Sequence, residues 1–384
     1  MVADADLAVD ADEAIGLLAE CVRTETINPP GNEERMTALL ARRLEREGVA
    51  VEVQPLSSGR ANLLARVSGT GGGPSLVLSG HTDTVPPGEM PWNHAPWAAE
   101  REGDRLYGRG ACDMKSGLAA MAMALLLLRR AGTALRGDLV LAASAGEEVD
   151  CLGARAFVEA GALQGAGAIV VGEPTGGEVA IAHKGALWLR LVTRGRTAHG
   201  SMPNQGVNAL LRMHEVVARL RSLRLPPDSH PLLGPATMSV NTIHAGQSMN
   251  VVPDRCELGI DIRTVSARGH ETIERDIRAA VADLGFPVEV EVLTKRPPVE
   301  TDPESPIVRQ ALGLAAALGT GAREAVGCVY FTDASVYQEA LRVPVIIYGP
   351  GEAPLCHQPD EWVSLAKYLN AIRFYAALAL RYLE

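Results

Sequence analysis

The stretch LSGHTDTVP, residues 78–86, places an imidazole at His81 and a carboxylate at Asp83, directly after a run of aliphatic residues. In an open α/β sheet, ligands bind beyond the carboxyl ends of the strands, where the side chains of the following loops converge. An imidazole that binds a metal ion needs its second ring nitrogen anchored, and a nearby carboxylate is the usual anchor. The spacing therefore predicts that His81 is a metal ligand and that Asp83 orients it.

Further carboxylates occupy comparable positions, after other aliphatic segments or just before a helical one. They are Asp113 in GRGACDMKSG, the adjacent pair Glu147 and Glu148, and Glu173. Carboxylates gathered at one sheet edge repel one another, and a cation relieves the repulsion. Imidazole and carboxylate ligands without cysteine suit zinc, and also cobalt or manganese, and one carboxylate can bridge two such ions.

Each of these residues alone has a structural explanation. A single histidine after a strand is commonly a hydrogen-bonded structural group, adjacent glutamates commonly lie in a solvated turn, and Asp113 could cap a helix. The whole set, at the ends of successive elements, favours a metal site.

Aliphatic runs and helical periodicity alternate along the first part of the chain. Strands are expected at Val49–Gln54, Leu63–Val67, Leu76–Leu78, Leu139–Ala143 and Ala168–Val171, and helices at Ala11–Cys21, Glu34–Glu47, Ser116–Arg130 and Gly153–Ala160. This alternation predicts an α/β fold with a mixed, mostly parallel sheet flanked by helices. The pattern resumes late in the chain, with helices expected at Pro306–Leu318 and Trp362–Tyr382 and a strand at Val343–Ile347.

The middle of the chain has a different pattern. LWLRLVTRG and CELGIDIRT alternate apolar with polar residues, which is typical of an antiparallel sheet with one solvated face. Helical patterns at Val207–Arg221 and Glu271–Leu284 complete an α+β unit, and Lys295–Pro306 has the composition of a linker. We therefore expect a discontinuous domain of residues 1–180 and 295–384 and an inserted domain of residues 181–294.

Composition excludes several classes of function. The formal net charge of the 384 residues is −10, and no stripe of lysine or arginine indicates nucleic-acid binding. The acidic amino-terminal stretch does not resemble a secretory signal, and the longest apolar run, Leu118–Leu128, is too short to cross a bilayer. The six cysteines are scattered, which indicates reduced thiols. We expect a cytoplasmic protein that acts on a small molecule, without nucleic-acid or membrane partners.

Five motifs occur together: GHTDTVP, YGRGACDMKSG, AGEE, GEPT and the late GPG with HQPDE. In this order they resemble the dinuclear zinc amidohydrolase and peptidase family that contains acetylornithine deacetylase, succinyl-diaminopimelate desuccinylase, aminoacylase and glutamate carboxypeptidase. The resemblance covers nearly the whole chain. GEPT, HKG and HQPDE make the deacetylase and desuccinylase branch the most similar one.

The resemblance implies two zinc ions per chain. One would be held by His81, Asp113 and Glu173, and the other by Asp113, Glu148 and His357, with Asp113 bridging. Glu147 would be the general base that takes a proton from the bridging water and delivers it to the leaving amine. The peptide bond between Asp113 and Met114 is where the family has a cis bond.

The inserted domain resembles the family's lid, which also forms a homodimer. His199 in TRGRTAHGSMP matches a histidine that reaches the partner subunit's site and stabilises the oxyanion, although the residue taken alone reads as part of a surface turn. Asn250 and Arg263 match positions that bind the substrate carboxylate, and an arginine suits a planar anion. Arg263 could equally be an exposed strand charge.

The implied reaction is hydrolysis of an N-acyl amino acid. The segment Phe331–Ser335 lies where the family has a pocket loop, and it departs from the glycine-rich version of many desuccinylases, which slightly favours a deacetylase. A carboxypeptidase or dipeptidase of the same family is the alternative enzyme, and a catalytically inactive binding module is the alternative of another class.

Overall fold

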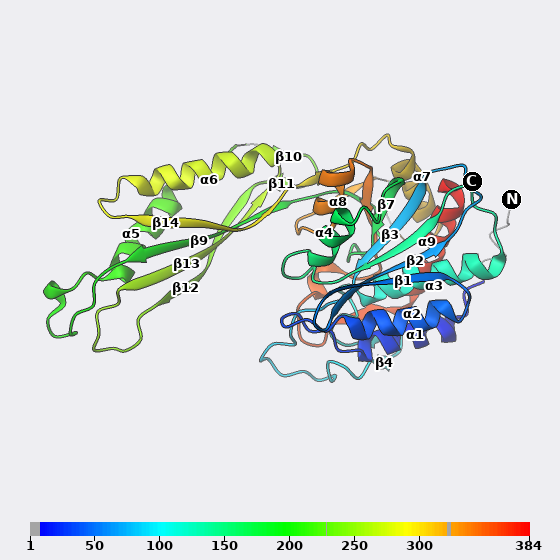
Figure 1. Cartoon of the computed structure of the whole chain (residues 1–384), viewed down its shortest axis with the longest axis horizontal. Helices are drawn as coiled ribbons and strands as arrows, with labels where there is room; N and C mark the ends of the chain where they lie inside the picture. Colours follow the sequence, from blue (N-terminus) through cyan, green and yellow to red (C-terminus); the bar gives the residue numbers. More distant parts are fainter. Residues whose placement is uncertain (1–7, 228, 321–323) are drawn as a thin grey trace. The chain divides into compact units, whose positions relative to one another are not determined.

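A computed structural model describes residues 8–227, 229–320 and 324–384 (Figure 1). The first seven residues, part of the acidic amino-terminal stretch, lie outside the described residues. The described residues form two compact units. Unit 1 draws on Met1–Ala182, Glu300–Gly327 and Thr332–Glu384, and unit 2 on His183–Val299 and Cys328–Phe331. Among the described helices, none combines the length and the apolar character that a bilayer crossing requires.

The main sheet has the strand order β1-β2-β6-β3-β7-β17-β8-β15, with β16 paired to β8. Its strands are β1 Ala50–Ser57, β2 Arg60–Val67, β3 Ser75–His81, β6 Leu139–Ser144, β7 Ala166–Val171, β8 Ala180–His183, β15 Val299–Glu300, β16 Val326–Cys328 and β17 Val345–Ile347. The central strands β6, β3, β7 and β17 are parallel, whereas β1 with β2, β2 with β6, and β17 with β8 are antiparallel. The predicted α/β fold with a mostly parallel central sheet is confirmed.

Helices cover both faces of this sheet. They are α1 Ala11–Arg23, α2 Glu34–Glu45, α3 Lys115–Ala131, α4 Leu152–Glu159, α7 Pro306–Ala317, α8 Ala334–Leu341 and α9 Leu365–Tyr382. The apolar helix α3 packs against α1 and α9 in the largest hydrophobic core, while α4 and α8 pack together and contact β6 and β17. A small antiparallel sheet of β4 Glu100–Glu102, β5 Arg105–Tyr107 and β18 Trp362–Ser364 completes the unit.

Helix α3 lies very close to the loop that follows β7. A Cβ atom built on Gly117 would stand 2.0 Å from the carbonyl oxygen of Gly172, so only glycine permits this approach. The contact brings the start of α3, and with it Asp113, next to Glu173. Because β3, β6, β7 and β17 are parallel, the loops after all four strands meet at one edge of the sheet.

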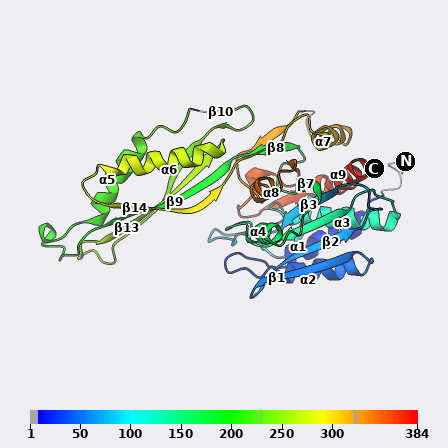
Figure 2. The same cartoon turned by 45° about the horizontal axis from the view of Figure 1, so that its top comes forward.

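Unit 2 contains an antiparallel sheet with the order β12-β13-β9-β14. Its elements are β9 Gly185–Arg194, α5 Ala209–Ser222, β10 Ser229–His230, β11 Gly234–Pro235, β12 Thr237–Ala245, β13 Arg255–Thr264, α6 Ala267–Ala282 and β14 Val288–Arg296. Figure 2 shows α5 and α6 side by side along this sheet, where they bury leucines and isoleucines of β9 and β13. The other sheet face carries charged residues such as Arg190 and Glu291, as the alternating pattern predicts.

Two expectations about elements were wrong in detail. Trp362–Ser364, expected as the first turn of a helix, pairs with β5 as strand β18, and the Ser364 side chain then caps α9. The expected linker Lys295–Pro306 contains the end of β14 and the short strand β15. Both segments find backbone partners far away in the sequence, which local periodicity does not reveal.

Candidate metal centre

His81 is the last residue of β3, and its ring is buried. Its Nδ1 lies 2.9 Å from the backbone carbonyl oxygen of Asp83 and 3.5 Å from the Asp83 carboxylate. A carbonyl oxygen only accepts, so Nδ1 carries a proton, and Nε2 is the ring atom through which His81 could bind a metal ion. Nε2 lies 3.1 Å from Asp113 Oδ1 and 3.7 Å from Glu173 Oε1.

His357 approaches Asp113 from the other side. It lies in the loop after β17, with a positive φ of 63°, and its Nε2 is 3.4 Å from Asp113 Oδ2 and 3.2 Å from Glu148 Oε2. Asp113 therefore offers one carboxylate oxygen to His81 and the other to His357. This is the arrangement expected of a carboxylate that bridges two ions. The Asp113–Met114 peptide bond is cis, as the resemblance implied.

Asp83 ties the end of β3 to the loop after β6. Its Oδ1 accepts hydrogen bonds from the backbone N–H groups of Gly146 and Glu147, at 3.0 and 3.1 Å. Its Oδ2 accepts from the N–H of Glu148 at 3.2 Å and from the Asn28 side chain at 2.9 Å. The carboxylate thus organises the backbone of the Glu147–Glu148 loop, a role that goes beyond the predicted orientation of His81.

Glu147 and Glu148 point to different parts of the cluster. One ligand atom from each of His81, Glu147 and Glu173 lies within 4.8 Å of the others, and the same holds for His81, Asp113 and Glu148. The Oε1 atoms of Glu147 and Glu148 are buried and have no hydrogen-bond partner among the described residues.

The pKa values of the cluster are shifted as expected for several carboxylates that lie close together without a neutralising cation. Burial raises the pKa values of Glu147, Glu148 and Glu173, and neighbouring carboxylates raise them further. Hydrogen bonding to Asp113 raises the pKa of His357 to about 10. Burial opposes a charge on His81, yet its hydrogen bond to Asp113 and nearby carboxylates raise its pKa well above the ordinary value.

These observations fit divalent metal ions. The cluster offers imidazole and carboxylate ligands, and its buried, unpartnered oxygens would otherwise carry a desolvation cost. A cation would supply the charge that reverses these pKa shifts. His81, Asp113, Glu147, Glu148, Glu173 and His357, the described residues that surround Asp113 and His81, all belong to unit 1.

In unit 2, the backbone pairs the segments that contain His199 and Asn250. His199 is bridged to Val251, and the N–H of Gly200 donates to the carbonyl of Asn250 at 2.7 Å. The His199 ring is exposed, and its Nδ1 accepts from the N–H of Ser201 at 3.1 Å. The proton therefore sits on Nε2, which leaves an exposed donor suited to an oxyanion.

Arg263 lies apart from this pair, near the other end of β13. Eight residues separate it from Arg255 at the start of that strand, which corresponds to roughly 26 Å at a strand rise of about 3.3 Å. Its Nε and Nη2 bind Asp261 at 2.9 and 3.0 Å, and its guanidinium lies 5.5 Å from the ring centre of Phe331. Its Nη1 is buried without a hydrogen-bond partner among the described residues.

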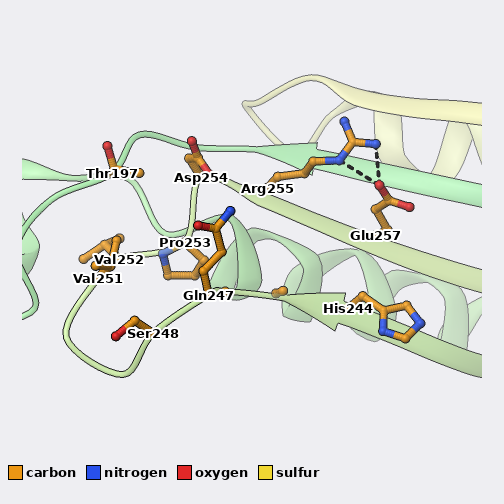
Figure 3. Close-up of a pocket in the computed structure, with 12 residues that line it drawn as sticks. Thr197, His244, Gln247, Ser248, Val251, Val252, Pro253, Asp254, Arg255 and Glu257 are labelled. Atoms are coloured by element: carbon orange, nitrogen blue, oxygen red, sulfur yellow. Dashed lines mark hydrogen bonds and ion pairs between the residues drawn. The ribbon is translucent and has the colours of Figure 1, made fainter.

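A separate pocket of about 380 Å³ lies beside the end of β12 (Figure 3). Its lining includes His244, Ser248 and the charged pair Arg255 and Glu257, and it contains none of the residues predicted for the site. Figure 3 shows the Arg255 guanidinium joined to Glu257, with Nε 2.7 Å from the carboxylate. The arginine is thus engaged within the protein, which disfavours this pocket as an anion site.

Two buried residues that hydrogen-bond to the predicted site residues were not predicted from the sequence. Glu361 is buried, and its Oε1 accepts from the N–H groups of Cys112 and Asp113 at 2.8 and 3.0 Å, while Arg109 pairs with its other oxygen. Asn28 supports Asp83, as described above. Glu361 belongs to the HQPDE motif, which was a usable signal, but Asn28 had none.

Comparisons with known proteins agree with this geometry. Residues 77–381 match the peptidase family M20/M25/M40. The probable succinyl-diaminopimelate desuccinylase of Staphylococcus epidermidis is 27% identical, with 97% of this chain and 98% of the relative covered. The acetylornithine deacetylase of Aliivibrio fischeri is 31% identical over 88% of both chains.

Solved structures show the same fold. An M20 metallo-carboxypeptidase from Sulfolobus solfataricus superposes with a TM-score of 0.80 at 19% identity, covering 97% of this chain and 99% of the other. A dinuclear metal-binding M20 peptidase from Bacillus subtilis has a TM-score of 0.72 at 21% identity, covering 97% and 98%. The chain therefore belongs to the peptidase family M20/M25/M40 and is a hydrolase that acts on amide bonds.

Proposed function

We propose that the protein hydrolyses the amide bond of an N-acyl amino acid, with two zinc ions bound at the cluster in unit 1. The observation that carries the proposal is the position of Asp113 between His81 and His357, at 3.1 and 3.4 Å through different oxygens. His81, Asp113 and Glu173 would hold one ion, and Asp113, Glu148 and His357 the other. Bound divalent ions supply Lewis acidity and lower the pKa of water at such sites.

Glu147 is the proton carrier in this proposal. Its buried carboxylate has an unpartnered oxygen beside His81 and Glu173, and its backbone is fixed by Asp83. It takes a proton from the attacking water and delivers it to the nitrogen of the leaving amino acid.

The lid residues support a homodimer. Arg263 is suited to the α-carboxylate of the substrate through its unpartnered Nη1, and it lies near the end of β13, whereas the paired segments of His199 and Asn250 lie before the start of that strand. We therefore propose that His199 and Asn250 of one subunit serve the site of its partner, where His199 binds the developing oxyanion.

The identity of the acyl group is the part of the substrate that the proposal leaves undecided. Both named relatives remove an acyl group from an amino acid, and they differ in whether it carries a second carboxylate. The Phe331–Ser335 segment slightly favours an acetyl group. Within it, Thr332 and Asp333 are buried, so these two side chains do not form an open anion site.

A substrate panel tests the proposal. The zinc-loaded protein would be assayed with N-acetylornithine, N-succinyl-diaminopimelate, other acylated amino acids and a set of dipeptides, with metal content measured in parallel. Hydrolysis of acylated amino acids above dipeptides supports a deacylase. Preferential cleavage of dipeptides would support the peptidase alternative, which the family name also allows. Near-zero metal content with no hydrolysis would support a binding module.

A further inference from the structure

Asp333 is a buried carboxylate of unit 1 that the proposed reaction does not use. It immediately precedes α8 and is 2% exposed. Its Oδ2 accepts a hydrogen bond from Ser144 Oγ at 2.6 Å, and the Cys151 sulfur lies within 4.8 Å of the carboxyl group. A carboxylate buried at a cost in desolvation is usually retained for what it organises.

Ser144 and Cys151 lie at the two ends of the loop that carries Glu147. Ser144 is the last residue of β6, and Cys151 immediately precedes α4. The Cys151 thiol donates to the backbone carbonyl of Glu147, with a sulfur to oxygen distance of 3.9 Å. One side-chain atom from each of Glu147, Cys151 and Asp333 lies within 4.8 Å of the others. Asp333 is thus hydrogen-bonded to one end of the loop at Ser144 and lies close to Cys151 at the other end and to Glu147.

Tyr337 extends the network to the neighbouring strand. Ser79 Oγ donates to the Tyr337 hydroxyl oxygen at 3.0 Å, and this hydroxyl is also hydrogen-bonded to Ser144. Ser79 lies on β3, two residues before His81. The first turn of α8 is therefore joined to the ends of β3 and β6, two of the strands after which the cluster lies.

The charge of Asp333 acts in the same direction as these bonds. Glu147 lies between this negative charge on one side and the imidazole of His81 on the other. Repulsion from Asp333 directs the Glu147 carboxylate toward His81 and Glu173.

We propose that Asp333 is a positioning residue for Glu147, which holds the loop of residues 145–151 through Ser144 and keeps the Glu147 carboxylate facing the ligand cluster. The inference rests on the proposed role of Glu147 as the proton carrier. In this role Asp333 acts through the position of Glu147.

The test is a double-mutant cycle on the full-length, zinc-loaded protein. It compares the wild type with Asp333→Asn, Glu147→Gln and the double variant, using the best substrate from the panel. Asp333→Asn should lower kcat by about 10- to 100-fold, the size of a small misplacement of a reacting group. KM and the metal content should stay unchanged. In the Glu147→Gln background the same substitution should cause no further loss in kcat, because both substitutions impair the same function, proton transfer by Glu147.

Two further variants separate positioning from general stabilisation. Ser144→Ala removes the same hydrogen bond from its other end and should reproduce the loss in kcat, even if Asp333→Asn folds poorly. Asp138→Asn is the matched control, because that carboxylate accepts from the Gly69 N–H at 2.9 Å and pairs with Arg66 outside the cluster. It should lower stability and leave kcat unchanged.

Three results would overturn the inference: wild-type kcat in Asp333→Asn, loss of metal from that variant, or losses that add in full in the double variant. A Glu147→Gln protein with wild-type kcat would instead refute the proposed role of Glu147, and the positioning inference with it. The cycle therefore distinguishes the two failures.

Discussion

The Oδ1 atom of Asp83 lies 3.1 Å from the backbone nitrogen of Glu147 and accepts its hydrogen bond. Asp83 also presents its own carbonyl oxygen to the ring of His81. One residue therefore binds the ring of His81 at the end of β3 and fixes the path of the loop after β6. The two halves of the cluster are coupled through this buried carboxylate, and the coupling can be measured.

Asp83→Asn should weaken metal binding by about 10- to 100-fold, the usual cost of losing support behind a ligand. The asparagine amide has only one oxygen, so its NH₂ group would face a backbone N–H that now points at the carboxylate. Two donors facing each other cannot form a hydrogen bond. Metal content after dialysis against a chelator measures the effect. Asp302→Asn, on an exposed loop of the same unit, is the control, and equal metal retention by both variants would contradict the assigned role.

Glu147→Gln and Glu148→Gln should have different effects. Glu147→Gln should keep both metal ions and lose most activity, because the amide cannot accept the proton. Glu148→Gln should deplete one ion, since the Glu148 carboxylate stands 3.2 Å from His357. Metal analysis alongside kcat checks both expectations, and identical behaviour of the two variants would show that the roles are not divided in this way.

Arg263→Lys should raise KM by about tenfold or more and change kcat little, because a lysine loses the planar fork that binds a carboxylate. The variant also loses the contact with Asp261 that orients the guanidinium. Steady-state kinetics on the best substrate measures the split. Arg190→Lys is the control, because that arginine lies on the same sheet and pairs with Glu291. A fall in kcat at constant KM would argue against a role in substrate binding.

His199→Ala should lower kcat by about 10²–10³, the size of losing one oxyanion donor, with the metal content unchanged. Mixing it with Glu147→Gln, under conditions where subunits exchange, should restore activity. One site of each mixed dimer then has its own Glu147 and the partner's His199. Continued inactivity after demonstrated exchange would show that His199 does not act across subunits.

Acid should destabilise the protein through His183. Burial lowers the pKa of this histidine from 6.5 to about 4, so it is neutral when folded and takes up a proton when unfolded. Its contribution to stability is complete above about pH 6.5 and is lost as the pH falls to about 4, up to about 3 kcal/mol.

Urea unfolding at about pH 7 and about pH 5 tests this expectation. The drop in stability between the two should be smaller in His183→Gln than in the wild type. His214→Gln, an exposed histidine on α5, should behave like the wild type. An equal drop in all three proteins would show that the buried histidine does not carry the effect.

The sequence allowed prediction of those features that depend on strand ends. His81, Glu147 and Glu173 follow aliphatic runs, and parallel pairing alone brings such positions to one edge. The assignments of Asp113 and His357 to ions came from the resemblance, because these residues arrive on loops that no local pattern positions. The buried hydrogen bonds that hold the site residues in place could not be predicted from the sequence. The bond between Ser144 and Asp333 joins residues 189 positions apart, and only tertiary packing brings them together.

The insertion of unit 2 into unit 1 has a consequence for biosynthesis. The ribosome makes His81, Asp113, Glu147 and Glu173, then all of His183–Val299, and only afterwards strand β17 and His357. At about 5–20 residues per second, unit 2 alone delays the synthesis of His357, the last of the proposed ligands, by roughly ten seconds. A nascent chain therefore carries an acidic and incomplete set of the proposed ligands for that time, and the set is complete only when translation has passed His357.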